Sequence, residues 1–128
     1  MNKAKTLVLA VLTITLAIFL TTAAADSSIT PYASATIVNY SVMFNSNKSI
    51  SFYCLADEVC TTIKASYTVS KLVDGDWDEL FSGTITARNT ELLQSNKTST
   101  KINSGTYRVS VSYTAGGDTR STSDQTTY

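Results

Sequence analysis

Apolar and polar residues alternate one by one through several stretches of this 128-residue chain. Ile63–Ser70 and Tyr107–Thr114 carry an apolar residue at every second position, and the shorter Ile50–Cys54 repeats the pattern. Successive side chains of a strand point to opposite faces, so each stretch builds one apolar face and one polar face. This period of two predicts antiparallel β-strands that turn one face to a core and the other to water.

Turn-forming residues separate these stretches. Asp74-Gly75-Asp76 is typical of a hairpin turn, because Asp and Gly tolerate the positive φ that tight turns need. Thr36–Phe44 is expected to form the first strand and Thr119–Thr127 the last. Further breaks fall at Asn45–Asn47, Ala87–Asn89, Asn103–Gly105 and Gly116-Gly117. The pattern predicts an all-β domain of about seven short strands, arranged as a two-sheet antiparallel β-sandwich.

The first 25 residues have the layout of a secretory signal peptide. Lys3 and Lys5 precede an uncharged apolar run and the small residues Ala23–Ala25. This order predicts a helical signal peptide that is cleaved after Ala25. A second small-residue site at Ala33-Ser34-Ala35 is an alternative cleavage position. The rival interpretation is an uncleaved membrane anchor, although a membrane span needs roughly 20 apolar residues and the uninterrupted run here is shorter. The predicted organisation is a signal peptide, 1–25, a flexible segment, 26–35, and the β-sandwich domain, 36–128.

Cleavage changes the charge of the chain. Loss of Lys3 and Lys5 leaves eight basic residues against ten acidic ones, a net charge of about −2. No basic patch remains of the kind that binds nucleic-acid phosphates. We therefore expect an extracellular protein with no nucleic-acid partner and no stable membrane span, whose oligomeric state stays open.

Cys54 and Cys60 are the two cysteines of the chain. In an exported protein such a pair predicts a disulfide, here closing a short loop. A reactive thiol is the alternative, but the chain has no histidine to activate a thiolate. Two thiols alone make an incomplete metal site, and no metal or cofactor is expected.

Ser104–Val109 resembles the tyrosine corner of immunoglobulin-type domains. In that motif a Gly-x-Tyr segment begins a strand and the Tyr hydroxyl bonds back to nearby backbone, and the matching residues here are Gly105 and Tyr107. Antibody domains carry a Cys where this chain has Val109, and Trp77 does not fit the usual core-Trp spacing. The resemblance implies an Ig-like sandwich without the inter-sheet disulfide of antibodies.

A second resemblance covers most of the chain beyond residue 25. The segments that carry it are Cys54, Thr61-Thr62-Ile63, Gly75-Asp76-Trp77 and Gly105–Val109. In this order they are similar to a family of small secreted bacterial proteins, mainly Gram-positive, whose function is uncharacterised. Cys60 departs from the single-cysteine pattern of that family. The resemblance implies a secreted β-domain and assigns no activity.

The acidic residues Asp74, Asp76, Asp78 and Glu79 cluster at the predicted hairpin turn. Their spacing is similar to the start of a calcium loop, which needs Gly at its sixth position and Glu at its twelfth. Those positions hold Glu79 and Ile85. The pattern favours a solvated turn and leaves calcium binding open.

Three aromatic residues, Trp77, Tyr53 and Tyr40, are candidates for a binding surface. Aromatic side chains are enriched at interfaces, and the alternative is that these three cover a small core. Without histidine, Ser-His-Asp and Cys-His catalytic arrangements are excluded, and we expect no enzyme and no catalytic residues. The predicted function is a secreted, non-catalytic binding or interaction module for an extracellular protein or glycan. A secreted toxin or antimicrobial protein that acts on neighbouring cells is the alternative.

Overall fold

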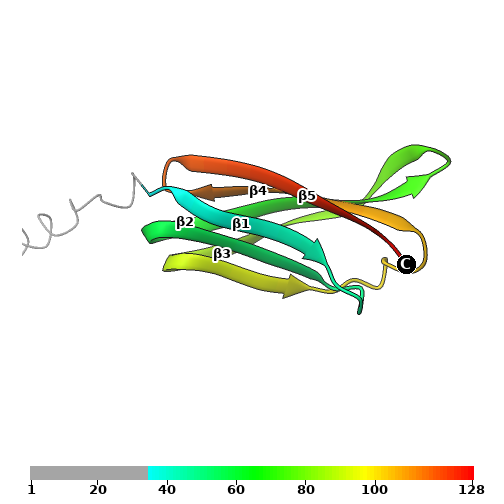
Figure 1. The fold of residues 1–128 in the computed structure, drawn as a ribbon, viewed down its shortest axis with the longest axis horizontal. Coiled ribbons are helices and arrows are strands. Elements are labelled where there is room, and N and C mark those ends of the chain that lie inside the picture. The colour runs from blue at the N-terminus through cyan, green and yellow to red at the C-terminus, as the bar shows by residue number, and fades with distance from the viewer. Residues whose placement is uncertain (1–34) are drawn as a thin grey trace, which may run out of the picture. The chain divides into compact units, whose positions relative to one another are not determined.

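A computed structural model describes residues 35–128 of the chain. Within them five antiparallel strands form one sheet, which confirms the predicted all-β class (Figure 1). The strands are β1 Ile37–Phe44, β2 Ile50–Val73, β3 Asp76–Lys97, β4 Thr106–Ala115 and β5 Asp118–Thr127. In the same part of the chain no helix is long and apolar enough to cross a bilayer. The predicted signal peptide, its cleavage sites after Ala25 and near Ala33, and segment 26–34 lie outside the described residues.

β2 and β3 form one long hairpin with its turn at Asp74-Gly75, the position that the sequence predicts. Asp74 and Gly75 have φ angles of 52° and 88°, the left-handed backbone that Asp and Gly adopt at low cost. The two strands are 24 and 22 residues long, and the structure has five strands where about seven short ones were expected. The expected breaks at Cys54–Cys60 and Ala87–Asn89 do not end the strands, because ladder pairing resumes beyond each of them.

A bulge bends this hairpin near its middle. Between the pairs Leu55–Leu92 and Cys60–Thr90, β2 has the four residues Ala56–Val59 and β3 has one. Unequal numbers of residues on paired strands bend and twist the ladder. Before the bend β2 lies between β1 and β3, and beyond it β2 lies between β3 and β4, with β5 outside β4. The sheet therefore curls, and its two halves face each other (Figure 1).

One core fills the space between the two halves. Phe52, before the bend of β2, meets Tyr67, beyond it, with ring centres 4.8 Å apart. Burial alternates along β4 as the sequence predicts, with Val109 and Val111 inward and Ser110 exposed between them. The largest fully buried side chains are Tyr107, Tyr113, Phe52, Ile50, Ile63 and Leu93.

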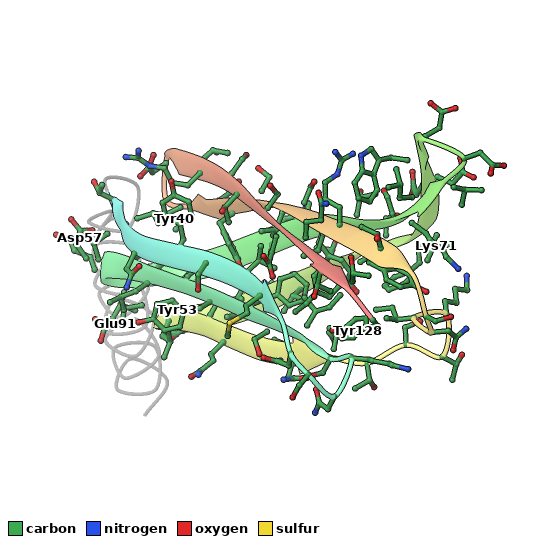
Figure 2. All side chains as sticks on the ribbon, turned by 45° about the vertical axis from the view of Figure 1, so that its right-hand side comes forward. Tyr40, Tyr53, Asp57, Lys71, Glu91 and Tyr128 are labelled. Atoms are coloured by element: carbon green, nitrogen blue, oxygen red, sulfur yellow. The ribbon has the colours of Figure 1, made fainter. Side chains whose placement is uncertain are left out.

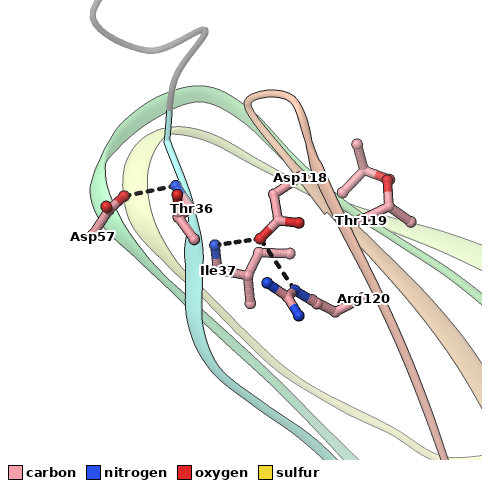
Figure 3. Close-up of polar contacts among 7 residues, drawn as sticks. Thr36, Ile37, Asp57, Asp118, Thr119 and Arg120 are labelled. Carbon is pink, nitrogen blue, oxygen red and sulfur yellow. Dashed lines mark hydrogen bonds and ion pairs between the residues drawn. The ribbon is translucent and has the colours of Figure 1, made fainter.

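β1 and β5 run side by side in the same direction, and side chains join them in place of a backbone ladder. The Ile37 N–H donates to Asp118 Oδ2 at 3.0 Å, and the Phe44 N–H donates to Asp124 Oδ2 at 2.8 Å. Figure 3 shows the first of these bonds, with Arg120 Nε 3.2 Å from the same carboxylate oxygen. The carboxylates of β5 thereby occupy donors of β1 that would otherwise form an open edge.

Candidate functional site

Rows of hydroxyl side chains cover the outer face of β5, β4 and β2 beyond its bend. Ser112 on β4 pairs with Ser66 on β2 and with Ser121 on β5. Directly paired residues on neighbouring strands share a face, at a strand spacing of about 4.8 Å. A second row repeats this arrangement two residues along each strand. We call the set the hydroxyl face: Ser66, Thr68, Ser110, Ser112, Ser121 and Ser123.

The hydroxyl face is shallow and open to solvent. A surface depression of about 490 Å³ lies over it, lined by these six residues together with Val111 and Thr122. None of the lining side chains is charged. Each hydroxyl both donates and accepts hydrogen bonds, so the depression suits a neutral ligand that also carries donors and acceptors.

A tryptophan and an arginine border the hydroxyl face on the side of the β2–β3 turn. Arg108 lies two residues before Ser110 on β4, so its side chain leaves the sheet on the same face. The Arg108 guanidinium carbon lies 4.4 Å from the centre of the Trp77 ring, a cation–π contact. Trp77 is half-buried and pairs with the exposed Leu72. The border therefore adds an aromatic ring and a fixed positive charge to the rows of hydroxyls.

The other two aromatic candidates lie elsewhere. Tyr53 points to the outer face of β2 before its bend, in the opposite half of the sheet. Tyr40 packs against the core, and its ring centre lies 6.5 Å from that of Tyr113. Figure 2 shows Tyr40 and Tyr53 at the end of the sheet away from Lys71, which precedes the hairpin turn. The structure does not bring the two tyrosines and Trp77 together in one surface.

Tyr107 anchors the segment that leads into β4. Its buried hydroxyl accepts a bond from the Asn103 N–H at 2.9 Å and donates to the Ser104 carbonyl oxygen at 3.3 Å. Gly105 has a φ of 130°, and a Cβ at this position would lie 2.9 Å from Lys71 Cε. These two bonds tie the Tyr107 ring to the backbone just before it and fix the start of the strand that carries Arg108.

The predicted disulfide between Cys54 and Cys60 is not formed, and both thiols are free and buried. Each cysteine is held in its own section of the ladder, one before the bend of β2 and one beyond it, and the Cys60 thiol donates to the Glu58 carbonyl oxygen at 3.4 Å. Burial, with Cys60 and Asp118 nearby, raises the pKa of Cys54 to about 11. Burial also raises the pKa of Cys60, with Asp57 and Glu58 adding to the shift. A raised pKa keeps both thiols protonated, the opposite of an activated nucleophile.

The acidic residues of the hairpin turn, Asp74, Asp76, Asp78 and Glu79, are all exposed. Asp76 and Asp78 lie in the paired, extended part of β3, so the backbone does not wrap around a common centre. Among residues 35–128 no three carboxylate, thiol or imidazole groups gather as ligands for a metal ion.

The hydroxyl face was not among the residues that the sequence singled out. Its signal was present, because the outward positions flanking Tyr67 and Val111 are Ser or Thr. The alternation in the sequence does not reveal the register between strands, and it is this register that places Ser112 between Ser66 and Ser121.

Comparison of the chain with protein-family models, with curated proteins and with solved structures finds no significant match in any of the three.

Proposed function

We propose that this chain is a secreted, non-catalytic binding module that recognises a neutral glycan through the hydroxyl face. The observation that carries this proposal is the uncharged depression of about 490 Å³ lined by paired Ser and Thr hydroxyls. The Trp77 ring at its border, one face of which packs on the Arg108 guanidinium, adds an aromatic surface beside the hydroxyls.

The chemistry of the face matches that of a sugar. A neutral sugar presents hydroxyls that donate and accept, as the Ser and Thr side chains do, so neither partner leaves a charge unpaired on binding. Three neighbouring strands fix the spacing of the backbone positions that carry the hydroxyls. The half-buried Trp77 ring offers an apolar surface of the kind that concentrates binding energy.

The finer fold and the location belong to the same proposal. The curled sheet and the backbone bonds of Tyr107 support an Ig-like two-sheet sandwich, with the two halves of the curl as its sheets. The layout of residues 1–25 supports export, and the resemblance to small secreted bacterial proteins agrees with it. In this arrangement the hydroxyl face is the outer surface of one sheet and is open to the surroundings of the cell.

Binding to immobilised neutral polysaccharides tests the proposal. The purified protein is applied to a panel of mannan, β-glucan and galactan, and retained protein is titrated to a dissociation constant. The triple variant Thr68→Ala/Ser110→Ala/Ser123→Ala removes one row of hydroxyls, and we expect at least about tenfold weaker binding from three lost hydrogen bonds.

The matched control changes the outer face of the other half of the sheet. Ser41→Ala/Gln94→Ala removes two polar side chains beside Tyr53 and should bind as the parent protein does. Absence of binding to every neutral polysaccharide would overturn the proposal. An equal loss of affinity in the triple variant and the control would show that the glycan does not bind at the hydroxyl face.

A further inference from the structure

A separate crevice opens at the edge of the core, beneath the segment that joins β3 to β4. Its volume is about 250 Å³. Four of its lining residues are apolar or aromatic: Ile50 comes from β2 before the bend, Tyr67 from β2 beyond it, Phe81 from β3 and Ile102 from the connecting segment. Thr98 and Ser99 of the connecting segment complete the lining together with two lysines. Tyr67 faces the core side of β2, whereas its neighbours Ser66 and Thr68 belong to the hydroxyl face, so the two sites lie on opposite sides of the strand.

The wall formed by Tyr67 is fixed before any ligand arrives. Its ring packs on Phe52, and the partner residue across the ladder is Gly83. A Cβ at Gly83 would lie 2.6 Å from the Tyr67 hydroxyl oxygen, so glycine leaves the space in which the ring lies over β3. A preformed wall reduces the ordering cost of binding.

Two lysines stand at the mouth of the crevice. Lys97 and Lys101 are exposed members of its lining, and the lining contains no carboxylate. The Lys101 ammonium nitrogen lies 3.4 Å from the Leu80 carbonyl oxygen, which holds this charge beside the opening. The crevice thus combines an apolar interior with an uncompensated positive mouth.

We propose that this crevice binds a small organic carboxylate with an apolar body. The apolar part would lie between Ile50, Tyr67, Phe81 and Ile102, and the carboxylate would meet Lys97 and Lys101 at the surface. The volume sets the size of the ligand, because a dry cavity of roughly 150 Å³ already holds benzene and the pockets of drug-sized ligands measure roughly 300–1,000 Å³. A single ring or a short alkyl chain fits between these limits. Binding here does not depend on glycan recognition by the hydroxyl face.

Phenylacetate and its uncharged counterpart phenylacetamide form a matched pair of probes. Each is titrated into isotope-labelled protein, and amide chemical shifts are followed by NMR. We expect phenylacetate to shift resonances of Phe81 and of residues 97–102, and phenylacetamide to bind about fivefold or more weakly, as expected for two exposed charge contacts. The variant Lys97→Gln/Lys101→Gln should abolish the preference for the acid over the amide.

Lys64→Gln is the control, because Lys64 is exposed on the outer face of β2 and is not part of the crevice. It should retain the parent protein's preference for the acid. Absence of shifts at the crevice with millimolar phenylacetate overturns the proposal. Equal affinity for acid and amide, or an unchanged preference in the double lysine variant, overturns it as well. The polysaccharide assay is scored separately, so failure of one site is distinguishable from failure of the other.

Discussion

The hydroxyl of Tyr113 donates a hydrogen bond of 2.6 Å to the carbonyl oxygen of Ser41. The same hydroxyl oxygen accepts a bond of 3.1 Å from the Tyr53 N–H. Ser41 and Tyr53 are partners in the ladder between β1 and β2, so a side chain from β4 is inserted between two paired strands. Tyr113 therefore ties the two halves of the curled sheet to each other at a buried point.

Replacing Tyr113 with Phe should lower the free energy of unfolding by about 1–3 kcal/mol, because it leaves a part-buried carbonyl and a part-buried N–H without their partner. Urea unfolding followed by circular dichroism measures the change. Tyr53→Phe serves as the control, since the Tyr53 side chain lies on the outer face and only its backbone N–H takes part in the bridge. An equal loss in the two variants would contradict the role assigned to the Tyr113 hydroxyl.

High pH should selectively weaken the protein that retains Tyr113. Burial raises the pKa of Tyr113 to about 12 in the folded state, whereas an unfolded tyrosine ionises near about 10. The folded state therefore holds the proton more tightly, and this part of the stability is complete below pH 10 and is lost as the pH rises toward 12. The stability gap between the parent protein and Tyr113→Phe should narrow over that interval. A gap that stays constant from pH 9 to 12 would refute the assigned shift.

Gly105→Ala should destabilise the protein by about 1–3 kcal/mol, because an L-residue is strained at this φ and its Cβ would press on Lys71. Gly75→Ala is the informative comparison, since Gly75 also has a positive φ but no atom lies within 4 Å of an added Cβ. Thermal unfolding of both variants should give the larger loss for Gly105→Ala. The reverse order would argue against a close approach of Lys71.

Cys54 and Cys60 should be unreactive in the folded protein. Both thiols are buried and have raised pKa values, so attack on a disulfide reagent such as DTNB at pH 8 should be slow until urea unfolds the chain. Two thiols per chain should then react rapidly. A mass two daltons below that of the reduced chain would instead reveal a disulfide and contradict the free pair.

Asp118→Asn should change how stability responds to acid. The backbone N–H of Ile37, supported by Arg120, holds the pKa of Asp118 below its usual value. Because the pKa of Asp118 is lower in the folded state than in the unfolded state, its ionised carboxylate stabilises the fold at pH values above the unfolded pKa of about 4. This stabilisation is lost as the pH falls below that value. The parent protein should therefore exceed Asp118→Asn in stability at pH 7, and the difference should shrink below pH 4. Urea midpoints of the two proteins, measured from pH 2 to 7, test this expectation. A difference in midpoint that does not change with pH would argue against this account.

Local patterns predicted the strand character of this fold and four of its breaks, at Asn45–Asn47, Asp74-Gly75, Asn103–Gly105 and Gly116-Gly117. The alternation around Val109 and Val111 marks inward and outward positions correctly, and Asp74-Gly75 lies at the hairpin turn. Both features depend on residues that are neighbours in the chain. They required no knowledge of which strands pair.

Features that depend on pairing between residues far apart in the chain could not be predicted from the sequence. The continuity of β2 through Ala56–Val59 follows from pairing with β3 on both sides of the bulge, which the turn-like residues there conceal. The bridge from Tyr113 to Ser41 exists because the sheet curls. The free state of Cys54 likewise follows from the ladder that holds it, whereas the short spacing to Cys60 suggested a bond.

β2 passes through the bend without a break and belongs to both halves of the curled sheet. A force that pulls the two halves apart is therefore carried along a covalent backbone before it reaches any hydrogen bond between strands. The two halves cannot slide past each other as two separate sheets can, because β2 connects them covalently. β3 also runs through the bend, because it pairs with β2 on both sides of the bulge, so two continuous strands join the halves.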